Sequence, residues 1–195
     1  MDGFDLFSST MAQVCAIAAE GVEYHVQDSG ADPIATKVKG GIAEQNIENY
    51  VRGKGRIPDT VLGGHVVLGG WDVDMGIYHP TYDHKLGLVE FKPEPHGAVY
   101  DRFSKECDRT KLLAVLQQFP EWQFGAVCFL HGDRPGPKAH LPTLKDDATK
   151  AGDRWHCVEI NLLGNVRTRY AKHYICARCF RPIPSLGGLN ADRKG

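Results

Sequence analysis

The stretch WDVDMGIYHPTYDHKLGLVEFK, residues 71–92, determines how the middle of this chain is expected to fold. Acidic and apolar residues alternate over 72–77, and the segment 86–92 is largely apolar until it ends in Glu-Phe-Lys. The segment 79–84 between them is polar and contains a proline. Alternation with a period of two is typical of strands, and a polar segment with proline is typical of a turn. The stretch therefore predicts two strands joined by a turn.

Antiparallel pairing about a turn centred near Tyr82 places Asp74 opposite Glu90 and Asp72 opposite Lys92. Directly opposed residues point to the same side of a sheet, with Cβ atoms about 4.5–5.5 Å apart. Two carboxylates at this separation repel each other unless a cation lies between them, and hard divalent cations prefer oxygen ligands. We therefore predict a magnesium site with a lysine beside it. The alternative is a surface hairpin in which Asp72 and Lys92 form an ordinary cross-strand pair.

Asp74, followed on the next strand by Glu90-Phe91-Lys92, resembles the core motif of the PD-(D/E)XK nuclease superfamily, and the resemblance covers about residues 40–130. The expected elements follow the order of that family's core: a helix over 40–51, three strands within 61–92, a helix over 98–119 that ends at Pro120, and a buried apolar strand over 124–130. The resemblance implies an α/β fold with a restriction-endonuclease-like αβββαβ core, in which helices flank a mixed central sheet.

The resemblance also implies a function, a metal-dependent nuclease that hydrolyses phosphodiester bonds in DNA, with an endonuclease favoured. Matching the family's motif, Asp74 and Glu90 would hold Mg²⁺, for which Mn²⁺ can substitute, and the carbonyl of Phe91 would join them. Lys92 would orient or help to deprotonate the attacking water. The first core helix of this family often carries a glutamate that reaches the metal, and Glu44 stands at that place, although a solvated acidic face explains it equally well.

Two further features bear on the candidate metal ligands and on the phosphate contacts. Pro58-Asp59 also spells the first letters of the family's name, but the apolar segment 61–68 would hold Asp59 away from the site, so Asp74 is preferred. Basic residues that could contact phosphates lie in a glycine-rich loop and in the helix over 98–119, where a solvated basic face is the ordinary alternative: Lys54, Arg56, Arg102 and Lys105.

The net charge of −1 keeps a second function open, because nucleic-acid-binding proteins are often basic overall. That alternative is a non-catalytic nucleic-acid-binding protein that keeps the nuclease-like fold. DNA is the favoured partner in both cases. A homodimer is compatible with the nuclease assignment, because many nucleases of this type pair their subunits to cut two strands.

The C-terminal part of the chain contains a CxxC pair, Cys176 and Cys179, which is half of a tetrahedral zinc site. Residues elsewhere could complete such a site through the fold: His173, His156, Cys157 and Cys107. Ordinary buried thiols and a redox dithiol are the alternatives to Zn²⁺.

The length of 195 residues predicts one domain, divided into an N-terminal helix and lead-in (1–39), the nuclease-like core (40–163) and a basic, cysteine-containing segment (164–195). We expect a helix over 10–20 with Met11, Val14, Cys15 and Ala18 on its apolar face, a short strand near residues 22–26, a loop over 131–152 and a strand over 155–163. No apolar run is long enough to cross a bilayer, and six cysteines without a signal peptide favour a reducing compartment. A cytoplasmic protein without a membrane partner is expected.

Overall fold

The computed structural model describes residues 2–29, 49–53, 57, 59–80, 84–92, 102–133, 141–162 and 172–182. Its helices are α1 (Gly3–Ser29), α3 (Arg102–Gln118) and α4 (Leu141–Lys150), and its strands are β1 (Val61–Leu62), β2 (Val66–Leu68), β3 (Trp71–Val73), β4 (Met75–Tyr78), β5 (Lys85–Lys92), β6 (Phe124–Asp133), β7 (Arg154–Ile160) and β8 (Lys172–Phe180). Within these ranges, six strands form one mixed sheet in the order β1-β4-β5-β6-β8-β7, and β2 pairs with β3 separately. The chain is therefore of the α/β class, as the sequence predicts.

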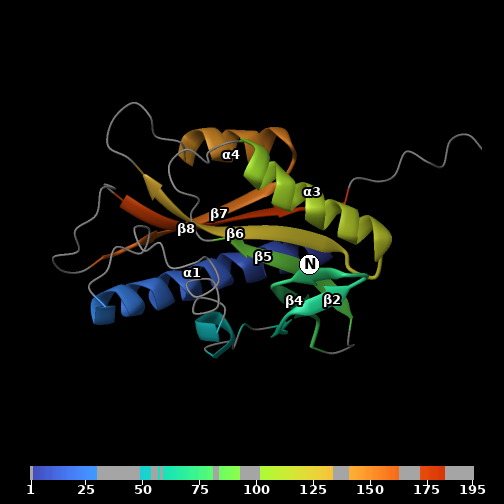
Figure 1. Ribbon diagram of the computed structural model, residues 1–195, viewed down its shortest axis with the longest axis horizontal. Coiled ribbons are helices and arrows are strands. Elements are labelled where there is room, and N and C mark those ends of the chain that lie inside the picture. The colour runs from blue at the N-terminus through green and yellow to red at the C-terminus, as the bar shows by residue number, and fades with distance from the viewer. Residues whose placement is uncertain are drawn as a thin grey trace, which may run out of the picture.

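Helices cover both faces of the sheet, with α1 on one face and with α3 and α4 on the other (Figure 1). In α1, the predicted apolar face of Met11, Val14, Cys15 and Ala18 is confirmed, because all four side chains are buried against the sheet. The strand expected near residues 22–26 is wrong. The apolar spacing continues from Ala18 to the buried Val22, so the helix extends to Ser29.

Strand β5 sends alternate side chains to the two faces. Val89 and Phe91 belong to the cluster beneath α1, whereas Leu88 belongs to the cluster beneath α3. Strand β6 lies parallel to β5 and is buried on both faces, as its continuous apolar run predicts. Parallel neighbours need a long crossover connection, and α3 lies within the connection between these two strands. Glu90, which lies between Val89 and Phe91, therefore points to the α3 face.

The expected strands over 61–68 and 71–77 are each divided in two. Val61 and Leu62 pair with β4 in the main sheet, whereas β2 and β3 form a hairpin whose turn is Gly69-Gly70, with φ angles of 55° and 88°. Positive φ at both turn residues matches the right-handed twist of a two-residue hairpin and is a conformation that glycine adopts without strain. The break between β3 and β4 falls at Asp74.

The elements that follow the predicted αβββαβ elements also belong to the sheet or pack on it. Strand β8 lies between β6 and β7 in the interior of the sheet, so the C-terminal segment supplies a central strand. The expected loop over 131–152 contains α4, whose Leu141, Leu144 and Ala148 recur at helical spacing and pack on the sheet. Pro142 is tolerated because it stands in the first turn of that helix. Among the helices described, none has both the length and the apolar composition needed to span a membrane.

Candidate active site

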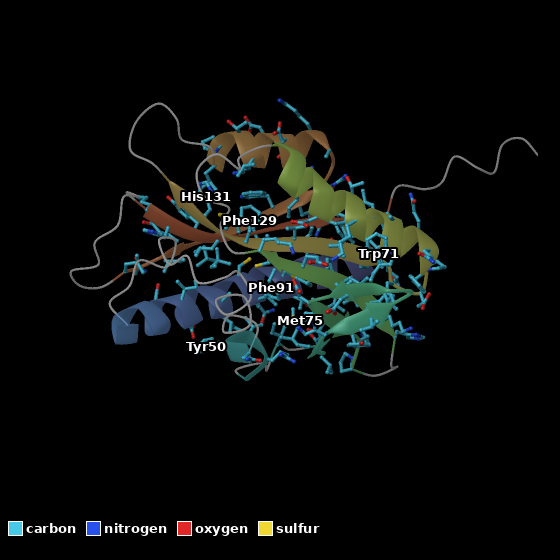
Figure 2. All side chains as sticks on the ribbon, viewed as in Figure 1. Tyr50, Trp71, Met75, Phe91, Phe129 and His131 are labelled. Carbon is cyan, nitrogen blue, oxygen red and sulfur yellow. A yellow bond between two sulfur atoms is a disulfide. The ribbon has the colours of Figure 1, made fainter. Side chains whose placement is uncertain are left out.

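The register of β4 on β5 brings Asp74 next to Glu90. Met75 pairs with Val89 and Gly76 with Leu88, and Asp74 lies in the bend directly before Met75, where the negative charge of Glu90 acts on its carboxyl. A turn centred on Tyr82 predicts this register, which is confirmed for Met75, Gly76 and Ile77. Between Ile77 and Tyr78, nearer the turn, the register shifts. Figure 2 labels Met75 on β4 and Phe91 on β5. These two residues directly follow Asp74 and Glu90 in the sequence.

Asp74 is partly buried and stands beside a second negative charge. Its Oδ2 atom accepts a hydrogen bond from the backbone N–H of Phe91 at 2.7 Å. Burial is the largest influence on this carboxyl, and together with the negative charge of Glu90 it raises the pKa of Asp74 from 3.8 to about 6. The Phe91 N–H and the charge of Lys92 act in the opposite direction. The electrostatic repulsion predicted from the sequence is therefore present.

Glu90 is 1% exposed and lies between two ammonium groups. Lys92 donates a hydrogen bond from Nζ to Oε2 of Glu90 at 3.0 Å, so this lysine lies beside the acidic pair as predicted. Lys111 of α3 donates from Nζ to the other oxygen, Oε1, at 2.5 Å, and also to the backbone carbonyl of Asp72 at 3.0 Å. A buried carboxylate is stable only when it is paired and hydrogen-bonded, and these two lysines satisfy that requirement.

A third carboxyl, that of Asp108 on α3, lies 4.0 Å from the Nζ of Lys92. Burial raises the pKa of Asp108, although the charge of Lys92 opposes that rise. Burial works to lower the pKa of Lys92, but the charges of Glu90 and Asp108 outweigh it, so the pKa of Lys92 is raised. Three carboxyl groups and two ammonium groups thus meet on the α3 face of β5, and they leave one negative charge if all are ionised.

The predicted pairing of Asp72 with Lys92 is wrong. Asp72 belongs to β3, which turns away from β5 at Asp74 and pairs with β2. The exposed carboxylate of Asp72 instead lies 3.1 Å from Nδ1 of His65. Asp59, the lesser candidate ligand, is exposed in the turn before β1.

Lys111 and Asp108 were not among the residues that the sequence assigned to the site. A helical spacing does connect them to the buried face of α3, since Asp108, Lys111, Leu112 and Val115 follow one another at intervals of three, one and three residues. Leu112 and Val115 are fully buried. This spacing is the signal that could have placed both polar residues beside the face of the sheet that α3 covers, rather than on a solvated helix face.

Several predicted site residues cannot be placed relative to this cluster. Glu44, Lys54 and Arg56 lie outside the described residues. Arg102 and Lys105 belong to α3, but their side chains lie outside the described part of the structure. Phe91 contacts the site through its backbone N–H, which donates a hydrogen bond to the carboxylate of Asp74.

The chemistry of the acidic pair fits a divalent ion, although its ligand set is small. Within the described ranges, no three side chains of His, Cys, Asp or Glu come together in a way that could hold a metal ion. Mg²⁺ is often bound by only one or two carboxylates, with water and substrate phosphate oxygens as the remaining ligands. Asp74 and Glu90 would supply such a pair.

The CxxC pair does not form a metal site. Cys176 and Cys179 are three residues apart on β8, so they point to opposite faces of the sheet. Cys176 forms a disulfide with Cys157, its direct partner on β7, which was not expected for a reducing compartment. Cys179 is a buried thiol on the α1 side, with Cys128 and Cys15 close by, and burial raises its pKa. The predicted zinc site at these two sulfur atoms is therefore wrong, and a buried thiol describes Cys179.

A second ion cluster, which we call the Asp153 clamp, ties α3 to the sheet. Arg109 of α3 donates from Nε and Nη2 to the Asp153 carboxylate at 3.0 and 3.1 Å, and Arg178 of β8 donates from Nε at 2.6 Å. The Asp153 side chain is 4% exposed. Arg109 also lies over the ring of Phe180, 5.1 Å from its centroid. This cation is thus a structural contact between a helix and the sheet, rather than part of a solvated basic face.

No protein-family model, no curated protein and no solved structure matches this chain. Its function is therefore inferred from the geometry of the site.

Proposed function

We propose that the protein is a metal-dependent nuclease that hydrolyses phosphodiester bonds in DNA, with an endonuclease favoured. The observation that carries this proposal is the proximity of the carboxyl groups of Asp74, directly before β4, and Glu90 on β5, with the ammonium group of Lys92 bound to Glu90. Opposed carboxylates of which one is almost fully buried are costly in a sheet unless a cation joins them. Mg²⁺, or Mn²⁺ in its place, suits two carboxylates and phosphate oxygens.

The connection of the strands that carry these residues supports a restriction-endonuclease-like core. Strands β4 and β5 form an antiparallel pair, α3 follows, and β6 then lies parallel to β5. This agrees with the latter part of the αβββαβ order that the sequence resembles. The site lies where β4, β5 and α3 meet: Glu90 and Lys92 are on β5, Asp108 and Lys111 are on α3, and Asp74 directly precedes β4.

The chain's own residues would divide the work of hydrolysis. A bound divalent ion would supply a water of lowered pKa and would offset charge on the phosphate. Asp74 must be ionised to bind the ion, and the N–H of Phe91 fixes the direction of its carboxylate. The ammonium group of Lys92, which is bound to Glu90, would orient the attacking water and stabilise the negative charge of the transition state.

A second candidate is favoured by one specific observation: Lys92 and Lys111 already balance the charge of Glu90 in the absence of a metal. Such a cluster could be purely structural, in a nucleic-acid-binding protein that keeps the nuclease-like fold. DNA binding by that protein would persist in EDTA, and the purified chain would bind no Mg²⁺ at Asp74 and Glu90.

Matched substitutions distinguish the two candidates. Glu90→Gln and Lys92→Met remove the charges of the site while nearly preserving side-chain volume. The control variants Glu121→Gln and Lys85→Met remove an exposed ion pair of 3.1 Å at the other end of β5. We expect Mg²⁺-dependent cleavage of DNA to fall by about 10²-fold or more in the site variants and to be unchanged in the controls. Full cleavage by a folded Glu90→Gln variant would refute the proposal.

A further inference from the structure

Lys111 has the surroundings of a bound cation rather than those of an ordinary surface lysine. Its ammonium group lies 2.5 Å from a carboxylate oxygen of Glu90 and 3.0 Å from the backbone carbonyl oxygen of Asp72. A carboxylate and a carbonyl are the types of oxygen ligand that hard divalent cations use. The side chain is 27% exposed, so water and a ligand can reach it.

The helix that carries Lys111 is fixed, whereas its side chain can move. Arg109, two residues earlier on α3, is bound in the Asp153 clamp to β8 and to the residue before β7. The backbone at residue 111 is therefore held against the sheet. A lysine carries its charge on a flexible four-carbon chain, so the ammonium group can change partners without any movement of the helix.

The two lysines that bind Glu90 differ in the other partners that they would keep if a divalent ion replaced them at this carboxylate. Lys92 keeps a second carboxylate, that of Asp108, 4.0 Å from its Nζ. Lys111 donates its other hydrogen bond to the neutral carbonyl of Asp72, and its charge acts on Asp108 less strongly than that of Lys92. If a divalent ion replaced Lys111 at Glu90, Lys111 would lose its main electrostatic attraction. Its ammonium group would then be available to another anion.

We propose that Lys111 is the resident counter-cation of Glu90, that a divalent ion displaces it, and that the freed ammonium group then binds a phosphate of the nucleic-acid substrate. This inference rests on the proposed function, because it requires Asp74 and Glu90 to bind a divalent ion. It adds a phosphate-binding residue on α3 and predicts that metal binding and phosphate binding are coupled through one side chain.

Direct titration with Mn²⁺ tests the first part without nucleic acid and without activity. The full-length wild-type chain is compared with Lys111→Met, with Asp74→Asn as the variant that removes the site, and with Lys172→Met as the control. Lys172 pairs with Glu159 at 2.9 Å on the exposed surface of β7 and β8. Removing the competing cation should tighten Mn²⁺ binding by about tenfold, because a hydrogen bond to a charged group is among the stronger ones in proteins. Lys172→Met should bind as the wild type does.

The outcomes separate the inference from the proposed function. If Lys111→Met binds Mn²⁺ at the Asp74-dependent site no more tightly than the wild type does, the inference is overturned but the proposed function is not. Absence of Asp74-dependent binding in every variant overturns the proposed function and the inference with it. Should Lys111→Met fail to unfold cooperatively, Lys111→Gln replaces it, and Lys111→Arg, which keeps the charge, should show no tightening beyond the wild type.

Salt dependence of oligonucleotide binding tests the second part. A fluorescent DNA oligonucleotide is titrated at several salt concentrations, once with Ca²⁺ and once with EDTA. With Ca²⁺, Lys111→Met should reduce the slope of log K against log salt by about one unit, because each phosphate contact releases about one counterion. With EDTA the slope should equal that of the wild type, since Glu90 then retains Lys111. Equal slopes with Ca²⁺ would overturn the phosphate contact.

Discussion

Glu90 is the residue on which the electrostatics of the site depend, because it is almost completely buried and both of its carboxylate oxygens accept a hydrogen bond from an ammonium group. Uncompensated burial of one charge costs several kcal/mol. For the neighbouring Asp74, burial and the charge of Glu90 outweigh the N–H of Phe91 and the charge of Lys92, so its environment favours the protonated form. A divalent ion would reverse that preference, because it attracts the ionised carboxylate.

The raised pKa of Asp74 predicts how the metal-free chain responds to pH. Because its pKa rises from 3.8 in the unfolded chain to about 6 in the folded chain, the folded state binds the proton more tightly. The stabilisation from this proton is complete below pH 3.8 and is lost as the pH rises through about 6. We expect the free energy of unfolding, measured with urea in EDTA, to fall over this range, and Asp74→Asn to show a smaller fall.

Asp108 acts in the same direction, since burial also raises its pKa, so the Asp74→Asn variant keeps the part of the fall that Asp108 contributes. Excess Mg²⁺ should reduce the loss above pH 6 in the wild type but not in Asp74→Asn. Identical pH profiles for the two proteins in EDTA would show that the carboxyl of Asp74 is not buried beside Glu90.

Residue-scale prediction from the sequence succeeded for the register of β4 on β5, but it failed for the pairing of Asp72 with Lys92 and for the helix. Asp74 and Glu90 could be matched because the side-chain period of a strand and the centre of one turn fix which residues oppose each other. Lys111 reaches Glu90 through the position of α3 on the sheet, which depends on contacts such as the Asp153 clamp between residues far apart in the sequence. No local period determines such a contact.

At the scale of elements, the docking of α3 depends on the Asp153 clamp. Replacing Asp153 by Asn leaves Arg109 and Arg178 without their shared carboxylate in a largely buried position. Because loss of one member of a buried ion pair leaves an uncompensated charge, we expect Asp153→Asn to lower the free energy of unfolding by about 3 kcal/mol. Urea denaturation at pH 7 measures this change.

Glu159→Gln serves as the control for this substitution, because its partner Lys172 is exposed and such pairs contribute at most about 1 kcal/mol. Equal stability of the Asp153→Asn and Glu159→Gln variants would mean that the clamp does not hold α3 to the sheet.

The elements that the sequence did not predict correctly have a common cause, which is that their partners are distant. The period of two identified strands over 61–68 and 71–77, but not that β2 and β3 leave the main sheet. The CxxC spacing suggested a chelating pair, whereas a continuous strand at β8 sends Cys176 and Cys179 to opposite faces. Helix periodicity located α3 within residues 98–119, but it gave only residues 10–20 of α1 and missed the shorter α4.

At the scale of the whole molecule, segments that flank the predicted core supply α1, which covers one face of the sheet (Figure 1), and β8, one of its strands. Phe7 and Met11 of α1 are fully buried in the cluster on one face. Strand β8 joins β6 to β7, so the described part of β7 has no other neighbour in the sheet. A single hydrophobic framework therefore includes residues from both ends of the chain.

This arrangement predicts that residues 40–163 do not fold on their own. Without α1 and β8, the apolar face of the sheet and the edges of β6 and β7 would be exposed. We expect the full chain to unfold in one cooperative thermal transition, followed by circular dichroism, and the 40–163 fragment to show none. A cooperative transition in the fragment would instead establish this region as an independent domain.

The central claim is that Asp74 and Glu90 form a divalent-ion site that cleaves a phosphodiester bond, and a cleavage assay tests it most directly. Wild-type protein and Asp74→Asn are incubated with linear, circular, single-stranded and branched DNA, each with Mg²⁺ and with EDTA. The site geometry predicts that the wild type cleaves at least one of these substrates with Mg²⁺ and none with EDTA, and that Asp74→Asn cleaves none. Absence of Mg²⁺-dependent cleavage by the wild type, or equal cleavage by Asp74→Asn, would contradict it.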